Sequence, residues 1–495
     1  MFKLRVASLA ALISVGQIFL VTPSQAAPWA EVGDLRLRSD LELLADYGLF
    51  SGPINSWPLP WAQISDGLNA QGLDLDSLPP HVLAALQRVE ILMPGNDAFR
   101  STRYEAGANF GNRPTLVRDF GDGTRADAEG YVRLEKHFTS SYVSINVGAR
   151  TAQSGEGLNF ERTYVAQVIG NWVGYLGWVE NWWGPGWDST LLFSNNARPF
   201  PKIGLKRLNP KPFESKWLSW IGPWQFEAFV GLLDEQRDFS NQVVAGIKLA
   251  IEPIDGLNIG FNRALQLCGN GRPCGLKTWA NSFIGIGNAD NTGTFDEPGN
   301  QIAGVDIRYG NHIGNVTYSL YGELIGEDED NIIIDQISIL SGASLNFPIS
   351  GDGTQLRLTG EYSDTFANRS FPGRERGSST YNNFIYRDGF TYRGRAIGHS
   401  LDGDSRLVSF TGSVVDRRNR VFRASFRHAD VNGDSRGRHS ISANREKINL
   451  VELETEWPTE WGDLRAQVSV ADDQANTPDR SKATASFEFG WRVRF

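Results

Sequence analysis

From about residue 104 to the C-terminus, apolar and polar residues alternate in one segment after another. Val143 and Ile145, for example, alternate with Ser144 and Asn146. Because successive side chains of a β-strand point to opposite faces, this pattern predicts strands with one apolar and one polar face. The same alternation recurs at 224–232, 243–261, 316–324 and 451–457. The sequence therefore predicts an all-β fold over most of the chain.

The final segment favours a membrane barrel over a secreted sandwich. One face is mainly aromatic and the other is mainly charged: Phe487, Phe489, Trp491, Val493 and Phe495 against Glu488, Gly490, Arg492 and Arg494. An amphipathic last strand that ends on an aromatic residue resembles the C-terminal signal of bacterial outer-membrane β-barrels. We therefore expect a large antiparallel outer-membrane β-barrel, with a secreted all-β sandwich as the alternative.

The composition agrees with a barrel. The mean hydropathy of −0.31 is that of a soluble protein. Beyond the N-terminal segment, the sequence lacks the apolar run of about 20 residues that a transmembrane helix needs, which excludes a helical membrane protein. An aromatic content of 11% excludes a disordered chain. Barrel strands are apolar only at every second residue, so a low mean hydropathy fits them.

The N-terminus has the pattern of an export signal. Lys3 and Arg5 precede a mostly apolar run over 6–21, and Ser24-Gln25-Ala26 supplies the small residues of a cleavage site. We predict a signal peptide over 1–26. The formal net charge is −9. Nucleic-acid phosphates require a basic surface, so no nucleic-acid partner is expected.

Residues 27–100 have a helical period instead. Asp34 is placed to cap a first helix that Gly48 ends, and Pro79-Pro80 opens a second. Apolar residues recur at helical spacing in both: Leu37, Leu41 and Leu44, then Val82, Leu86, Val89 and Met93. These faces are too small for an independent core of about 65 residues. We expect a periplasmic helical unit that docks on the rest of the chain.

The barrel region, 101–495, has room for roughly 16 to 20 strands at about 20–24 residues for each strand with its connection. Connections at 200–223, 264–300 and 363–404 look long, whereas Pro253-Ile254-Asp255-Gly256 is a tight turn. Bacterial barrels have long loops outside the cell and short turns in the periplasm. We therefore expect the three long connections to be extracellular.

Motifs for catalysis or metal binding are weak. The six histidines show no metal-ligand spacing, and no nucleophile elbow, P-loop or dinucleotide motif occurs. No metal, cofactor or enzymatic activity is predicted. The run Glu327-Asp328-Glu329-Asp330 could hold Ca²⁺, but a solvated acidic tip after a strand is favoured. Glycoside hydrolysis needs two facing carboxylates, for which Glu180 and Asp188 are candidates without a supporting motif.

The segment from Glu180 to Pro201 is unusually dense in aromatic and polar residues. Indole rings stack on the apolar faces of sugars, while carboxylate, amide and guanidinium groups bind their hydroxyls. The segment therefore predicts carbohydrate contacts by Trp182, Trp183, Trp187, Asp188, Asn195, Asn196 and Arg198. The alternative is that these tryptophans pack inside the barrel or belong to an aromatic belt.

Cys268 and Cys274 are the two cysteines of the chain, and the turn-forming residues GNGRP separate them. A disulfide persists in the oxidising compartment that an export signal implies. We predict a local Cys268–Cys274 bridge that pins one loop.

Three stretches carry a family resemblance: WWGPGWDSTLLFSNNARPFP at 182–201, EVGDLRLRSDLELLADYGLFSGPINSWPLPW at 31–61, and LQLCGNGRPCG at 265–275. The chain resembles the Wzi family of capsule-assembly proteins of the Gram-negative outer membrane. The resemblance implies an 18-stranded outer-membrane barrel with a helical unit at its periplasmic mouth. It also implies a lectin-like activity, but no residue can be carried over as a known sugar contact.

The resulting hypothesis is a non-enzymatic outer-membrane protein that binds capsular or surface polysaccharide and attaches it to the cell surface. A porin-like channel for sugars or other small solutes is the alternative, and a glycan-modifying enzyme is the third hypothesis. The expected partners are the polysaccharide, outer-membrane lipid and the polysaccharide export machinery.

Overall fold

The computed structural model describes residues 28–69, 78–94, 102–151, 157–284, 299–330, 333–369, 374–375, 380–383, 385–435, 439–477 and 482–495. The predicted signal peptide, 1–26, lies outside these residues. No helix in these ranges is long and apolar enough to cross a membrane.

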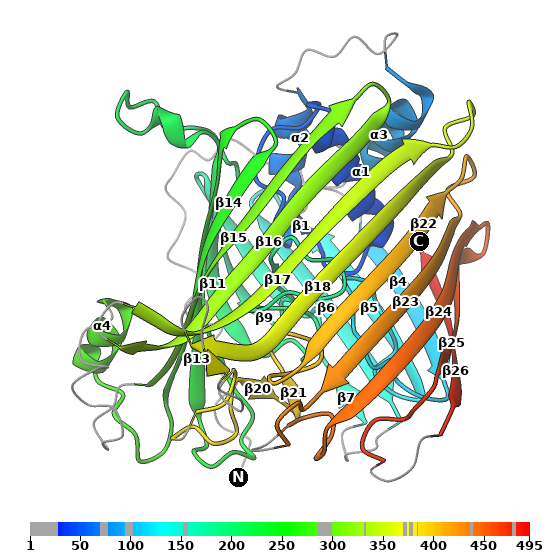
Figure 1. The fold of residues 1–495 in the computed structure, drawn as a ribbon. Coiled ribbons are helices and arrows are strands. Elements are labelled where there is room, and N and C mark those ends of the chain that lie inside the picture. The colour runs from blue at the N-terminus through cyan, green and yellow to red at the C-terminus, as the bar shows by residue number, and fades with distance from the viewer. Residues whose placement is uncertain are drawn as a thin grey trace.

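Most of the described chain forms one closed antiparallel barrel of tilted strands (Figure 1). The first half of the barrel consists of β4 (Thr102–Gly111), β5 (Ala128–His137), β6 (Ser141–Arg150), β8 (Tyr164–Ile169), β9 (Trp172–Gly177), β11 (Lys202–Arg207), β12 (Trp224–Leu232), β13 (Gln242–Ile254) and β14 (Leu257–Cys268). The second half consists of β15 (Gly299–Ile313), β16 (Val316–Asp330), β17 (Ile333–Pro348), β18 (Gln355–Arg369), β22 (Arg406–Val415), β23 (Val421–Val431), β24 (Glu446–Thr459), β25 (Gly462–Ala471) and β26 (Thr484–Arg494).

The predicted strand number and closure are confirmed. β26 pairs with β4, with Phe489 opposite Phe110, and this joins the last strand to the first. Two two-residue strands, β7 (Leu158–Asn159) and β19 (Arg374–Glu375), also pair within the sheet, but β6 pairs directly with β8, and β18 with β22. In the part of the chain that the structure describes, the barrel therefore has 18 strands.

The burial of the two strand faces separates a membrane barrel from a sandwich. In β6, Ile145 is 48% exposed and Ser144 is 0% exposed. In β26, Phe487 points outward while Glu488 is buried in the lumen. A sandwich buries its apolar face, whereas here the apolar face is outside and the polar face is inside, as in a barrel that contacts lipid. This confirms the outer-membrane barrel that the alternation predicts.

The two ends of the barrel differ in their connections. At one end the strands are joined by short turns, among them 170–171, 255–256, 314–315 and 460–461. At the other end the connections are long, among them 112–127, 178–201, 269–298 and 370–405. We call these the short-turn end and the long-loop end; in bacterial barrels they face the periplasm and the cell exterior, respectively.

One of the three expected extracellular loops was assigned wrongly. Residues 202–207 of the expected loop 200–223 form β11, and the remaining 208–223 lie at the short-turn end with the 3₁₀ helix η4 (Ser219–Ile221). The strand was missed because its inward positions are lysines. The Lys206 ammonium lies 2.7 Å from the Glu227 carboxylate in the lumen.

The acidic tip expected after residue 325 is also wrong, because β16 continues to Asp330. Glu327 is buried within the strand, and its carboxylate accepts a hydrogen bond from the backbone N–H of Tyr381 at 2.7 Å. The side chains of residues 328–330 lie outside the description, so the Ca²⁺ hypothesis stays untested.

The helical unit lies at the short-turn end. Its helices are α1 (Leu35–Asp46), α2 (Trp61–Asn69) and α3 (Pro80–Leu92). Asp34 caps α1 by accepting a hydrogen bond from the Leu37 N–H at 2.9 Å, as expected. The sequence reasoning missed α2 and the short strands of the Pro-rich corner: β1 (Trp29–Ala30) pairs with β3 (Leu59–Pro60), and β2 (Ser56–Trp57) pairs with a segment far along the chain.

The core of the protein lies inside the barrel lumen. A single cluster of buried apolar residues joins the helical unit, the lumen face of several strands and the segment around Trp182. Leu41 and Leu44 of α1 and Val89 of α3 belong to this cluster. The helical unit thus shares its core with the barrel, as its small apolar faces require.

Ion pairs hold the helical unit to itself and to the barrel wall. Arg88 of α3 binds Asp40 of α1 through two bonds of 2.7 and 2.6 Å. Asp46 and Glu42 of α1 also lie within ion-pair distance of arginines on the wall: Arg308 Nη1 to Asp46 Oδ1 at 2.7 Å and Arg357 Nη1 to Glu42 Oε2 at 3.1 Å. Near the short-turn end, these buried arginines each face a carboxylate.

Candidate functional site

The Trp-rich segment enters the lumen from the long-loop end. Residues 178–201, here called the plug segment, connect β9 to β11. They include β10 (Trp182–Trp183), which pairs with β2 of the helical unit, Trp182 opposite Trp57 and Trp183 opposite Ser56. Two parts of the chain that enter from opposite ends therefore meet inside the barrel.

The three predicted tryptophans pack within this plug. Trp182 and Trp183 are 0% exposed. Their indole N–H groups donate to the Gly186 carbonyl at 3.0 Å and to the Glu227 carboxylate at 3.2 Å. Trp187 is buried under the Arg38 guanidinium, which lies 4.4 Å from its ring centroid. In this structure the rings serve packing, the alternative that the sequence left open, and sugar stacking by them stays a prediction.

The four predicted polar residues lie on the same segment, and three of them are buried. Asp188 binds Arg427 at 2.8 Å. Asn195 and Asn196 donate side-chain hydrogen bonds to the carbonyls of Asp119 and Ala396, each at 2.9 Å. Arg198 is the most accessible of the four, with 20% of its side chain exposed, and lies 3.8 Å from Glu161. The structure brings the predicted set together, but as interior contacts.

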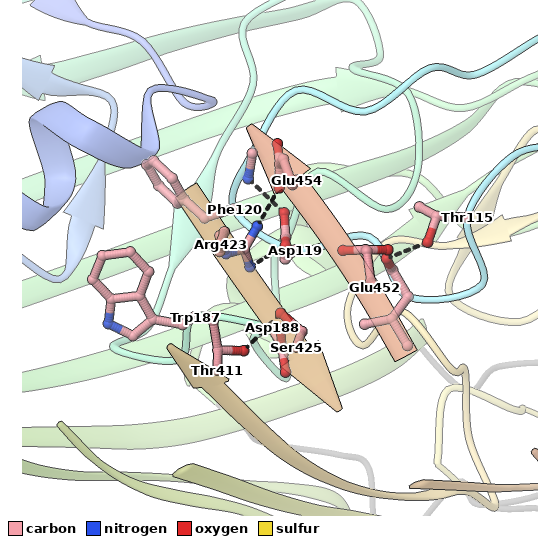
Figure 2. A network of polar contacts seen from close by, with 12 residues as sticks. Thr115, Asp119, Phe120, Trp187, Asp188, Thr411, Arg423, Ser425, Glu452 and Glu454 are labelled. Carbon is pink, nitrogen blue, oxygen red and sulfur yellow. Dashed lines mark hydrogen bonds and ion pairs between the residues drawn. The ribbon is translucent and has the colours of Figure 1, made fainter. Parts of the chain in front are cut away.

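The connection 112–127, between β4 and β5, folds against the plug segment and the barrel wall. Figure 2 shows Arg423 of β23 between Asp119 and Glu454, with guanidinium–carboxylate distances of 2.5 and 2.8 Å. Burial raises the pKa of Asp119, but Arg423 and Arg427 outweigh it and lower the pKa to about 2. The carboxylate is therefore charged at neutral pH and anchors the connection.

A cavity of about 510 Å³, here called the outer cavity, lies at the long-loop end beside this connection. That volume is within the range of sites for small ligands. Hydroxyl, amide and charged groups line much of it, including Asn112, Arg113, Thr115, Arg395, Ser440, Ser469, Asp473, Gln474, Thr484 and Ser486. Such groups supply the hydrogen bonds that sugar hydroxyls need.

No local pattern in the sequence indicates the outer cavity, because its lining comes from segments spread between residues 112 and 486. Two small polar residues are the local sequence features that belong to the cavity: Ser469 and Ser486, near the long-loop ends of β25 and β26. Ser486 lies on β26, which was recognised from its apolar face, whereas β25, which holds Ser469, was not among the predicted segments. Alternation shows that a position faces the lumen but not what lies opposite it.

A second cavity, of about 130 Å³, lies between the plug segment and the strands around β5 and β26. Its lining is strongly ionic, and its arginines are paired. Arg133 lies 2.6 Å from Glu31, and Arg162 lies 2.9 Å from Glu180. These pairs indicate that the charged groups around this cavity have a structural role.

The remaining predicted sites have different outcomes. Cys268 and Cys274 are joined by a disulfide at the end of β14, which confirms the predicted bridge. Within the described ranges, no group of three or more His, Cys, Asp or Glu side chains is arranged to hold a metal ion. Glu180 and Asp188 are each engaged by arginines.

Comparison with known proteins identifies the family. The model of the family "Capsule assembly protein Wzi" matches residues 99–487. An "uncharacterized 55.8 kDa protein in cps region" of Klebsiella pneumoniae is 26% identical over 465 residues, which cover 92% of this chain and 88% of the relative. The solved structure of Wzi from Escherichia coli, described as an outer-membrane, carbohydrate-binding β-barrel involved in group 1 capsule assembly, superposes with a TM-score of 0.79 at 22% identity. That match covers 95% of this chain and 100% of the solved chain. The family match spans most of the sequence, and the barrel fold agrees with it: the chain belongs to the Wzi family of capsule assembly proteins.

Proposed function

We propose that this protein binds exported capsular or surface polysaccharide at the long-loop end of the barrel and attaches it to the cell surface. The observation that carries the proposal is the outer cavity, a polar site of about 510 Å³ at the extracellular end of a barrel that belongs to a capsule-assembly family. The Wzi structure described as carbohydrate-binding has the same fold. The protein would act as a receptor and anchor for the polymer.

The test is the distribution of polysaccharide between cells and medium. A strain that lacks the gene should release polysaccharide that the wild-type strain retains, and the wild-type gene should restore retention. A double substitution at the outer cavity, Ser469→Trp with Ser486→Trp, should fold but fail to restore retention, because the indoles fill the site. Equal retention by the deletion strain and the wild type would contradict the proposal.

We further propose that the protein acts without catalysis. Glu180 and Asp188 are the carboxylates singled out for hydrolysis, and their ion pairs with Arg162 and Arg427 support a structural role. Purified protein should leave the chain length of the bound polysaccharide unchanged on a sizing column. Shortening of the polymer that disappears with Glu180→Gln or Asp188→Asn would instead support the enzyme hypothesis.

The channel alternative is less supported, because the plug segment and the helical unit share one packed core inside the lumen. In planar bilayers the protein should show no large, steady conductance. Such a conductance would favour the porin-like function instead.

Outer-membrane lipid and the machinery that exports the polysaccharide are the other proposed partners. Exposed aromatic side chains at the short-turn end support the lipid contact: Trp217, Trp220, Trp461 and Phe495. Aromatic rings of this kind gather at the interfaces of membrane barrels.

A further inference from the structure

Two arginines beside the outer cavity, Arg118 and Arg395, have no carboxylate within ion-pair distance among the described residues, whereas Arg125 nearby is paired with Glu161 and Glu180. Arg118, in the 112–127 connection, is 7% exposed, and its Nε has no hydrogen-bond partner among the described residues. Its Nη2 donates one bond, to the Thr124 carbonyl at 3.3 Å. In the described part of the chain, no carboxylate lies within ion-pair distance of Arg118. A buried charge without a counterion is costly to maintain.

Arg395, on the strand β21 (Arg395–Ala396), belongs to the same group. It lines the outer cavity and is half-buried. Across the described ranges its guanidinium has neither a hydrogen bond nor an ion pair. The strand pairs with β20 (Thr391–Tyr392) in a two-stranded sheet inside the long-loop end (Figure 1). The backbone around Arg395 is therefore held in place, while no group in the described ranges pairs with its charge.

These charges act on one another. Burial lowers the pKa of Arg118, and the positive charges of Arg125 and Arg395 lower it further. Burial and Arg125 also lower the pKa of Arg395, against the opposite effect of Asp402. Guanidinium groups keep their proton in proteins. Burial is the main cause of both lowered pKa values and neighbouring positive charge adds to it, although Glu488 and Glu129 act in the opposite direction on Arg118. A bound anion would offset both causes.

The cavity is positioned to bring an anion to these groups. Thr115 lines the outer cavity and also a small cavity of about 20 Å³ that Arg118 and Arg125 line. Among the described residues that line the outer cavity, Asp473 is the one carboxylate, and it already accepts hydrogen bonds from the backbone N–H groups of Gln474 and Lys482 at 2.8 and 3.2 Å. The lining of the outer cavity holds two guanidinium groups, Arg113 and Arg395, against this carboxylate, so it has a net positive charge in a chain whose formal net charge is −9.

We infer that the outer cavity selects acidic polysaccharide, with the carboxylate of an acidic sugar bound by the Arg395 guanidinium and attracted by the positive charge of Arg118 nearby. This inference rests on the proposed function and names the class of polymer that the site takes. Arginine binds carboxylate through paired, charge-assisted hydrogen bonds, so it provides orientation as well as attraction.

The experiment compares one polymer with and without its carboxylates. Short fragments of the polysaccharide from the surface of the producing cells are used as isolated and after chemical reduction of carboxyl groups to hydroxymethyl groups. Short fragments avoid multivalent binding. The full-length mature protein is held in phosphatidylcholine nanodiscs free of lipopolysaccharide, so that lipid phosphates cannot supply the anion. Affinity is measured by calorimetry for the wild type, Arg395→Gln and Arg118→Gln.

We expect the native fragments to bind the wild type about tenfold more tightly than the reduced fragments. Hydrogen bonds between charged groups raise an affinity by about tenfold or more. Arg395→Gln should lose about the same factor for native fragments and nothing further for reduced ones. Arg417→Gln is the matched control: its side chain is 64% exposed, in the turn between β22 and β23 at the opposite end. It should bind like wild type.

Each other outcome overturns the inference in a recognisable way. Equal binding of native and reduced fragments, or a neutral sugar composition, would leave the proposed function intact and remove the selection for acids. An Arg395→Gln effect that is the same for both fragments would assign the residue a role independent of the carboxylate. Binding of neither fragment to the wild type would contradict the inference together with the proposed function. Heat-dependent gel migration shows that each variant is folded.

Discussion

Arg88 at the short-turn end and Arg118 at the long-loop end are buried to nearly the same degree, at 6% and 7% exposed. Arg88 is held by Asp40 through two short hydrogen bonds. Arg118 has one long bond to a carbonyl and repulsive neighbours. A buried arginine that meets a carboxylate locks two elements together, whereas one that lacks a carboxylate is kept at a cost to stability. The comparison separates the part of the lumen that holds the protein together from the part that is available to a ligand.

The largest effect is expected where the helical unit meets the plug. Trp183→Ala removes a fully buried indole that packs against Phe193 and Phe229. The free energy of unfolding should fall by about 3–5 kcal/mol, the usual cost of such a truncation. Urea titration in detergent, followed by tryptophan fluorescence, measures it.

Trp217→Ala, at an 86% exposed tryptophan, is the control for this change and should unfold like wild type. If Trp183→Ala kept wild-type stability but bound polysaccharide more weakly, direct sugar stacking would be favoured. Trp183 would then belong to the part of the lumen that is available to a ligand.

Breaking the paired arginine should have the next largest effect. Arg88→Gln leaves Asp40 buried without its partner, and loss of one member of a buried pair costs about 3 kcal/mol or more. The same urea titration should detect it. Asp40→Asn removes the carboxylate charge that Arg88→Gln leaves unpaired. The double variant should therefore recover part of the lost free energy of unfolding. A double variant that is no more stable than Arg88→Gln would argue against the ion pair as the lock.

The pH dependence of the 112–127 connection should be smaller. The pKa of Asp119 is lowered to about 2 from the 3.8 of a free aspartate. A depressed pKa stabilises the folded state above the unfolded pKa, and the stabilisation disappears as pH falls from about 4 towards 2. It amounts to roughly 2 kcal/mol, since one pKa unit corresponds to about 1.4 kcal/mol.

Unfolding midpoints measured between pH 6 and 2 should show this loss in the wild type and less of it in Asp119→Asn. Identical pH profiles of the two proteins would mean that Asp119 does not anchor the connection.

The smallest effect should have the opposite sign. Arg118→Gln removes a buried charge that has no counterion among the described residues, so stability should stay the same or rise by up to about 1 kcal/mol. Thermal unfolding of Arg118→Gln beside Arg88→Gln gives the sharpest form of the comparison: the same substitution at equal burial should destabilise at one end only. A clear loss of stability at both ends would remove the distinction between them.

The strands and helices could be predicted because their signals are local. β6 and β26 were recognised from their own alternation, and α1 from Asp34 and three leucines. β11 was missed because its lumen face carries lysines, which are stabilised by Glu227, a residue on the next strand. α2 was missed because it follows directly after the Pro-rich corner, whose prolines predict an irregular segment there.

The candidate site was harder to predict, because it depends on contacts between residues that are far apart in the sequence. The segment around Trp183 is the densest in aromatic and polar residues and so suggested a ligand site. In the structure, however, the helical unit and the barrel wall cover its indoles. The outer cavity has no motif, since Arg395 and Ser486 come together only when the barrel closes. Composition shows which groups a chain possesses, but the burial and pairing of each group depend on distant residues.

The sequence by itself determined the barrel, its polar lumen, the N-terminal helices α1 and α3 and the Cys268–Cys274 bridge, because each depends on neighbours within a few residues. Only the tertiary structure decided that the plug tryptophans are interior and that no carboxylate of the described chain pairs with Arg118 or Arg395. The physical reason is that a charge is satisfied through space. Its partner, or the ligand that takes the partner's place, cannot be read from the order of residues along the chain.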